Sequence, residues 1–168
     1  MKVRIELGDI IEQKVDAVIY STNSDFLLSG GVGKSLSEKY GEEVQHSLDR
    51  AIKNQIIGAE SIGAVVNCTL SCMPWKLLLH TVVTNRNYVT DPDLVKQVLL
   101  KAIDFCDQTH GVYTIATSAL GCGYGDLSHV QFIQILKTVA GLYEQSDLKE
   151  IVVVCNSNEY YDQMQSSA

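Results

Sequence analysis

The sequence predicts an α/β fold in three layers, with helices on both faces of a central sheet. About six segments are typical of strands and about four of helices, and helices separate most of the later strands. Two glycine-rich loops each lie between a strand-like and a helix-like segment. Strands that alternate with helices are typical of layered α/β domains. The 168 residues suffice for one such domain and contain no repeat, linker or low-complexity segment, so we expect a single domain over residues 1–168.

The first third of the chain predicts two strands and one interrupted helix. In residues 2–7 apolar and charged side chains alternate, which is typical of a half-exposed strand. Residues 15–20 are more uniformly apolar, as in a strand that is covered on both faces. Residues 35–54 carry apolar side chains four positions apart and predict a helix that is interrupted near Gly41.

The rest of the chain continues the alternation of strands and helices. Residues 61–69 and 77–83 predict two strands, and Pro74 marks the connection between them. Asp91 is a candidate N-cap with Pro92 at the first helical position, which predicts a helix to about residue 109. The remaining predicted elements are strands at 112–117 and 151–155, a helix capped by residues 126–128, and a short closing helix at 159–165.

The composition argues against nucleic-acid and membrane partners. The formal net charge is -7 and the sequence pI is about 5.0, and no local basic patch offsets this charge. No run approaches the roughly 18 apolar residues of a membrane helix, and the N-terminus leads into an alternating strand rather than a signal peptide. We therefore expect a cytoplasmic protein with no membrane contact and no strong affinity for nucleic acid.

The cysteines and histidines form no pattern of metal ligands. The five cysteines are an odd number in apolar surroundings, which is typical of reduced, buried thiols. Cys68 and Cys72 have neither a second pair nor a histidine cluster nearby in sequence, so we expect no metal site. No cofactor is expected either. His80 lies within the apolar run LLLHTVV, and we interpret it as a hydrogen-bonded core histidine rather than a catalytic one.

The two glycine-rich loops predict an anion-binding site. The first contains Gly30, Gly31 and Gly33 and is followed by a helix that is expected to start just beyond them. The second is SALGCGYGDLS, residues 118–128. Backbone N–H groups in such loops and at helix N-termini carry partial positive charge that attracts phosphate. Because each loop follows a strand, the two can face each other across a crevice at the strand ends, and our hypothesis is a pyrophosphate between them.

A P-loop is an alternative explanation of the first loop. Gly33, Lys34 and Ser35 match the end of that motif, but the glycine that it requires five residues earlier is Leu28. A P-loop enzyme also needs an acidic residue at the end of a buried strand to hold magnesium, and the last strand is followed by Asn156. Hydrolysis of a nucleoside triphosphate is therefore the less favoured hypothesis.

Four segments together resemble the macrodomain family, whose members bind ADP-ribose. They are GDI at residues 8–10, TNSDFLLSGGVGKSL at 22–36, LLLHTVV at 77–83 and SALGCGYGDLSHV at 118–130, in the family's order. The resemblance implies a mixed, six-stranded sheet between layers of helices. It also implies that the partner is ADP-ribose, free or attached to a protein, bound in a crevice at the strand ends.

The resemblance implies how the two ends of the ligand are held. Asp9 would accept a hydrogen bond from the exocyclic amine of the adenine, a task that suits an ionised carboxylate, and Ile10 would offer its backbone N–H to the ring. Asn156 follows the last strand, where the family often has an aromatic residue that stacks on the adenine, and Tyr160 or Tyr161 could replace it. Asn23 would form a hydrogen bond with the distal ribose.

The glycine-rich loops would hold the middle of the ligand. Gly30, Gly31, Val32 and Gly33 would wrap the diphosphate and the distal ribose from one side. The second loop would close over them from the other side, with Tyr124 covering the distal ribose, and its contact residues would be Ser118, Ala119, Leu120, Gly121, Cys122, Gly123 and Tyr124. Cys122 is interpreted as a small loop residue rather than a nucleophile, because nothing nearby in sequence would lower its pKa.

Two departures from the family pattern concern catalysis. Many ADP-ribosyl hydrolases of this family have NAAN before the first loop, whereas this chain has Tyr20 at the first of those positions. Where a well-known hydrolase subgroup has Asp-Gly, this chain has Gly33 and Lys34. Asn23 and Gly33 are the candidate catalytic positions. The sequence leaves open whether the chain removes ADP-ribose from modified proteins, reads it without catalysis, or senses a signal derived from it.

Overall fold

The computed structural model describes residues 1–55 and 61–167. In this part of the chain, six strands form one sheet in the order β1-β6-β5-β2-β4-β3. Their bounds are β1 Lys2–Leu7, β2 Ala17–Ser21, β3 Val65–Asn67, β4 Leu77–Thr81, β5 Thr114–Thr117 and β6 Glu150–Cys155. The first five strands in this order are parallel to their neighbours, and β3 runs antiparallel to β4. The predicted mixed, six-stranded sheet is confirmed.

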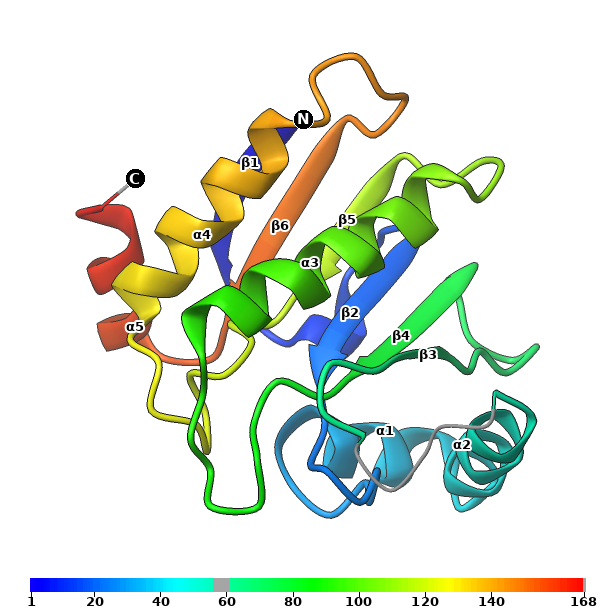
Figure 1. The fold of residues 1–168 in the computed structure, drawn as a ribbon. Coiled ribbons are helices and arrows are strands. Elements are labelled where there is room, and N and C mark those ends of the chain that lie inside the picture. Colours follow the sequence, from blue (N-terminus) through cyan, green and yellow to red (C-terminus); the bar gives the residue numbers. More distant parts are fainter. Residues whose placement is uncertain (56–60, 168) are drawn as a thin grey trace.

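Helices cover both faces of this sheet (Figure 1). In the same described ranges the helices are the 3₁₀ helix η1 Ile10–Glu12 and the α-helices α1 Gly31–Tyr40, α2 Glu43–Asn54, α3 Pro92–Asp107, α4 His129–Gly141 and α5 Asn158–Gln165. Helices α3, α4 and α5 pack on one face, and α1 and α2 pack on the other. The three-layer sandwich predicted from the sequence is therefore confirmed. Among the helices that the structure describes, none is long and apolar enough to cross a membrane.

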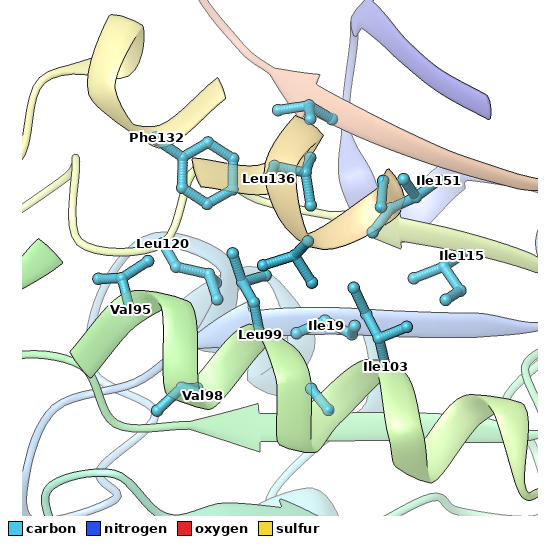
Figure 2. Close-up of a cluster of buried hydrophobic side chains, with 14 of the residues drawn as sticks. Ile19, Val95, Val98, Leu99, Ile103, Ile115, Leu120, Phe132, Leu136 and Ile151 are labelled. Carbon is cyan, nitrogen blue, oxygen red and sulfur yellow. The ribbon is translucent and has the colours of Figure 1, made fainter. Parts of the chain in front are cut away.

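The core consists of two clusters separated by the sheet. On β2, Ala17 and Ile19 contribute to one cluster, and Val18 and Tyr20 to the other, because successive side chains on a strand point to opposite faces. Figure 2 shows the first cluster, in which α3 and α4 pack over the sheet. The labelled side chains are Ile19, Val95, Val98, Leu99, Ile103, Ile115, Phe132, Leu136 and Ile151 from these elements, and Leu120 from the loop after β5. Burial of both faces explains the uniformly apolar sequence of the central strands.

The interruption predicted near Gly41 is confirmed, whereas two other element boundaries were wrong. Gly41 has φ +76 and ends α1, so the segment forms two separate helices. Counting α1 and α2 separately gives five α-helices in the described residues rather than about four. Helix α1 also begins at Gly31, within the first glycine-rich loop, rather than beyond it. The strand expected at 61–69 is only Val65–Asn67, because its pairing with β4 covers just these residues.

The helix caps follow local sequence signals. Asp91 caps α3 with its side chain accepting from the N–H of Asp93, and Pro92 stands at the first position as predicted. Ser128 and Gln131 form a reciprocal capping box at the start of α4. These caps fix where the chain turns from the second glycine-rich loop into α4 and from the β4–α3 connection into α3.

Candidate functional site

The predicted site residues gather at one edge of the sheet. Asp9 follows β1, Asn156 follows β6, the second glycine-rich loop follows β5, and Asn23 with the first glycine-rich loop follows β2. These four strands are neighbours and all parallel, so their carboxyl ends lie side by side. Ligands of open α/β sheets bind outside this edge. Segments more than a hundred residues apart in sequence thus meet at one edge.

Asp9 is exposed at the end of β1 and caps the short helix η1. Its Oδ1 accepts a hydrogen bond from the N–H of Ile11 at 3.1 Å. The N–H of Gly8 donates to the carbonyl of Cys155 at 2.8 Å, which fixes this turn beside β6. In the part of the chain that the structure describes, the other carboxylate oxygen has no hydrogen-bond donor, and an incoming amine could use it. The side chain of Ile10 is buried in the core.

The first glycine-rich loop places the N-terminus of α1 at this edge. Gly30 is the N-cap and Gly31, Val32 and Gly33 form the first turn of the helix, whose first N–H groups have no acceptor within the helix. Within residues 1–55 and 61–167, no side chain caps them. A Cβ on Gly33 would lie 3.1 Å from the Cα of Leu28, so glycine lets the loop pack closely under the helix. The free N–H groups and the helix dipole together favour an anion here.

Asn23 holds the loop that precedes these glycines. Its Oδ1 accepts from the N–H groups of Asp25 at 3.1 Å and Leu27 at 3.0 Å, and its Nδ2 donates to the carbonyl of Leu27 at 2.8 Å. Gln45 of α2 supports the same loop, because its Oε1 accepts from the N–H of Leu28 at 3.0 Å. One hydrogen of the Asn23 amide is left for a ligand. Sequence reasoning missed Gln45, which lies outside every quoted motif.

The second glycine-rich loop is fastened to the sheet and to Thr90. The N–H of Ser118 donates to the carbonyl of Ile19 at 3.1 Å, and Leu120 is buried in the core. A Cβ on Gly121, which has φ +79, would lie 2.6 Å from the Cγ2 of Thr90. Only glycine fits both this conformation and this contact. Thr90 was not predicted as a site residue, and it is what shapes the loop.

The remaining members of this loop range from buried to exposed. Ala119 is half-buried, and its carbonyl accepts from the N–H of Cys122 at 3.1 Å. Burial raises the pKa of the Cys122 thiol to about 12. The thiol is therefore protonated near neutral pH, as expected for a loop residue rather than a nucleophile. Gly123 and Tyr124 are exposed, and no atom beyond its chain neighbours would crowd a Cβ on Gly123.

The two glycine-rich loops meet through Tyr124. Its side chain extends to Gly30, so the hydroxyl of the second loop touches the N-cap of α1. Its ring also lies 6.0 Å, centroid to centroid, from the ring of Tyr88 in the β4–α3 connection. The predicted opposition of the two loops is therefore found in the structure.

His80 is a core residue, as the sequence indicated. It is fully buried on β4, and its Nδ1 lies 2.6 Å from the hydroxyl of Tyr20 on β2. Burial lowers the pKa of His80 to about 4 and raises that of Tyr20 well above its ordinary value. Both side chains are therefore neutral at physiological pH. Tyr20, which replaces the first asparagine of the hydrolase pattern, serves the core rather than the site.

The adenine end differs from the family's common aromatic arrangement. Asn156 is exposed after β6. Tyr160 of α5 stacks on His129, with ring centroids 3.9 Å apart and planes at 14°. Tyr161 packs against the core. One face of the Tyr160 ring is thus covered by His129, while 37% of the residue stays exposed.

Two other charged features are separate from this edge. Lys34 is exposed, and its Nζ lies 3.6 Å from Glu38, a helical surface pair, so the lysine of the P-loop alternative does not turn back over the loop. A hollow of about 340 Å³ is lined by Arg4, Glu6, Glu12, Gln13, Lys14, Val15, Thr114 and Glu150. Three of these side chains are glutamates, which would repel a diphosphate, and none belongs to the glycine-rich loops.

Comparisons with solved structures identify the same fold in other proteins. A variant of the macrodomain of Oceanobacillus iheyensis, solved with ADPR, superposes with a TM-score of 0.83 at 22% identity, covering 97% of this chain and 89% of that one. The Trypanosoma brucei macrodomain in complex with ADP-ribose gives a TM-score of 0.74 at 16% identity, covering 98% and 68%.

A relative from Escherichia fergusonii named O-acetyl-ADP-ribose deacetylase is 26% identical over 165 residues, which are 95% of this chain and 92% of that protein. The sequence profile of the Macro domain matches residues 19–136, a span that includes the first glycine-rich loop and all of the second. Because this match covers most of the chain, the protein belongs to the macrodomain family.

Proposed function

We propose that this protein binds ADP-ribose, free or attached to another molecule, at the carboxyl edge of its sheet. The observation that carries the proposal is the contact between the two glycine-rich loops beside the uncapped N-terminus of α1. Free N–H groups there suit a diphosphate. The Oceanobacillus iheyensis structure with ADPR and the Trypanosoma brucei structure in complex with ADP-ribose have the same fold and support this choice of ligand.

The two ends of the ligand follow from the order of the strands. Asp9 stands at the outer strand β1 and Tyr124 stands beside the loop after β2, so the adenine lies over β1 and β6 and the distal ribose beside Tyr124 and Asn23. The diphosphate then lies between Gly30–Gly33 of the first loop and Gly121–Gly123 of the second. The net charge of -7 favours an ADP-ribosylated protein rather than a nucleic acid as the larger partner. The cytoplasm is the compartment that we propose for this activity.

Removal of a group attached to the distal ribose is the second candidate function. The name of the Escherichia fergusonii relative, O-acetyl-ADP-ribose deacetylase, favours it. Hydrolysis needs a positioned water and a group that orients it. Here the amide of Asn23 keeps one free N–H, and Gly33 has no side chain to orient water, so the ligand's own diphosphate would have to hold the water. A reader without catalysis would have the same binding site.

A thermal-shift titration followed by a turnover assay separates these cases. ADP-ribose should raise the unfolding temperature in a concentration-dependent manner, because a ligand that binds only the folded state stabilises it. Release of ADP-ribose from a mono-ADP-ribosylated peptide, or of acetate from O-acetyl-ADP-ribose, would then identify a hydrolase. Binding without release would identify a reader, and no thermal shift at millimolar ADP-ribose would contradict the proposed function.

A further inference from the structure

An exposed aromatic rim lies next to the proposed ribose end of the site. It consists of Tyr88, Val89 and Tyr124, whose exposed fractions are 53%, 52% and 74%. Tyr88 and Val89 come from the β4–α3 connection and Tyr124 from the second glycine-rich loop, and the two tyrosine rings lie 6.0 Å apart. Exposed apolar side chains that cluster on a surface usually mark an interaction site.

The connection that carries Tyr88 and Val89 is a tightly built turn. Asn85 organises it, because its Oδ1 accepts from the N–H groups of Asn87 at 2.9 Å and Val89 at 3.0 Å. Its carbonyl accepts from the N–H of Tyr88 at 3.0 Å, and Thr84 and Thr90 form an antiparallel bridge at the base of the turn. The turn thus holds the two apolar side chains outward in a fixed arrangement.

Tyr88 adopts a backbone conformation that is unfavourable for an aromatic residue. Its φ is +60, in the left-handed region that residues other than glycine and asparagine rarely occupy. Such strain persists where surrounding contacts impose it, and it is concentrated at functional sites. A strained tyrosine with more than half of its surface exposed contributes little to folding, which points to a role in binding.

Carboxylates surround the rim. Asp91 and Asp93 begin α3 directly after the turn, and Asp126 accepts from the N–H of Thr90 at 2.7 Å. Asp25, from the loop after β2, lies 3.6 Å from Arg86 at the edge of the same turn. Four carboxylates thus lie on segments that adjoin the turn, and the cation of the turn, Arg86, is paired with one of them. This charge distribution attracts cations and repels a nucleic-acid backbone.

We propose that the rim of Tyr88, Val89 and Tyr124 binds the acceptor protein of an ADP-ribosylated substrate through cationic side chains next to the modified residue. Lysine or arginine would lie over the tyrosine rings, whose faces attract cations, while the flanking carboxylates add long-range attraction. The inference rests on the proposed function, because the ligand's distal ribose is what brings the acceptor to this rim. The rim would make the protein prefer acceptor proteins with basic residues next to the modified one, a preference that the ADP-ribose site alone does not supply.

The test compares three peptides that carry the same ADP-ribose linkage. Their flanking residues are lysine and arginine, glutamate and aspartate, or serine and glycine, and free ADP-ribose serves as the reference ligand. The basic peptide should bind about two- to fivefold more tightly than the neutral one, as expected for an exposed cation–aromatic contact. The acidic peptide should bind more weakly than the neutral one, and raising the salt concentration should narrow these differences.

Variants assign the preference to the rim. In Tyr88→Ala the tighter binding of the basic peptide should disappear, while affinity for free ADP-ribose stays unchanged. Tyr88→Phe keeps the aromatic face and should still bind the basic peptide more tightly than the neutral one. Asp126→Asn keeps an oxygen for the N–H of Thr90 and removes the negative charge. With affinities normalised to that for free ADP-ribose, the preference for the basic peptide over the neutral one should become smaller in this variant. Phe105→Ala, at an equally apolar exposed position on α3, is the matched control and should change nothing.

The outcomes separate this inference from the proposed function. Equal affinity for all three peptides, or a preference that survives Tyr88→Ala, would overturn the inference while leaving ADP-ribose binding intact. Tighter binding of an ADP-ribosylated oligonucleotide than of the basic peptide would overturn it in favour of a nucleic-acid partner. If the unaltered protein does not bind free ADP-ribose, the proposed function itself is refuted.

Discussion

The hydroxyl of Tyr124 lies 2.9 Å from the position that a Cβ would occupy on Gly30. The two residues are more than ninety positions apart in sequence, and each belongs to one of the glycine-rich loops. Gly30 has an extended backbone, with φ -155 and ψ 167, so any residue could adopt its conformation. The neighbouring tyrosine, rather than backbone strain, is therefore what restricts this position.

Replacing Gly30 with alanine should act on ligand binding through Tyr124. The new methyl group would displace the tyrosine, which we expect to cover the distal ribose, and affinity for ADP-ribose should fall. In a Tyr124→Ala background the same Gly30→Ala change should cost much less, because the colliding group is gone. Calorimetry on the four proteins of this cycle should give a coupling free energy of about 0.5–3 kcal/mol. If the changes in binding free energy caused by Gly30→Ala and Tyr124→Ala are strictly additive, Tyr124 does not mediate the loss of affinity in Gly30→Ala.

Asp9→Asn should weaken ADP-ribose binding without destabilising the fold. An asparagine oxygen can still accept from the N–H of Ile11, so the cap of η1 survives. The amide NH₂ would then face the adenine amine, donor against donor, and the affinity should fall by about 1–3 kcal/mol.

Asp91→Asn at the cap of α3 is the matched control for this change, since it replaces the same cap chemistry away from the adenine. Its affinity for free ADP-ribose should equal that of the unaltered protein. If Asp9→Asn binds ADP-ribose normally, Asp9 does not recognise the adenine.

Gly31→Glu should abolish binding of the diphosphate by bulk and by negative charge. Gly41→Glu is the control, because both glycines lie at ends of α1, both have positive φ, and neither has another residue's atom near a Cβ. Both substitutions strain the backbone, and Gly41→Glu does so more, because φ 76 with ψ -171 lies in a region that is essentially restricted to glycine. Binding by a folded Gly41→Glu variant would therefore show that strain at an end of α1 does not by itself abolish affinity. Affinity for ADP-ribose should be lost in the first variant and kept in the second. Equal binding by both folded variants would show that the first loop does not hold the diphosphate.

Stability should fall as the pH is lowered from about 6.5 to about 4. Burial lowers the pKa of His80 to about 4, so in this range the unfolded chain takes up a proton that folded His80 does not. The loss attributable to His80 is about 3 kcal/mol at most. His129, whose pKa is also lowered by burial, acts in the same direction.

His80→Gln should flatten this pH dependence, since glutamine can bond to the Tyr20 hydroxyl but does not titrate. Urea unfolding at pH 7 and pH 5 would measure this pH dependence. The relevant quantity is the difference between the free energies of unfolding at the two pH values, rather than the stability at either one. An unchanged difference in His80→Gln would show that His80 is not the group responsible.

The sequence predicted the layers, and it placed the candidate site residues at the ends of strands, because both depend on local patterns. The uniformly apolar run before Asn23 and the glycines at 30, 31 and 33 each indicate their own local structure. Parallel strands then bring the ends of such segments to one edge whatever the loops contain. For this reason the opposition of the two glycine-rich loops could be expected before the structure was known.

What the sequence did not predict depends on contacts between distant residues. Thr90 shapes the second loop only because the β4–α3 connection folds against Gly121, and Gln45 supports the first loop from another helix. The start of α1 at Gly31 accompanies close packing of Gly33 on Leu28, whose N–H is itself held by Gln45 of α2. Glycine's low helix propensity favours a later start, and tertiary packing outweighs it.

Isothermal titration with ADP-ribose, with ATP as the control ligand under the same conditions, tests the central claim most directly. The geometry predicts micromolar or tighter binding of ADP-ribose at one site and much weaker binding of ATP, because only ADP-ribose offers a distal ribose to Tyr124 together with an adenine to Asp9. No heat of binding with ADP-ribose, or equal affinity for ATP, would contradict the assignment of this edge as an ADP-ribose site.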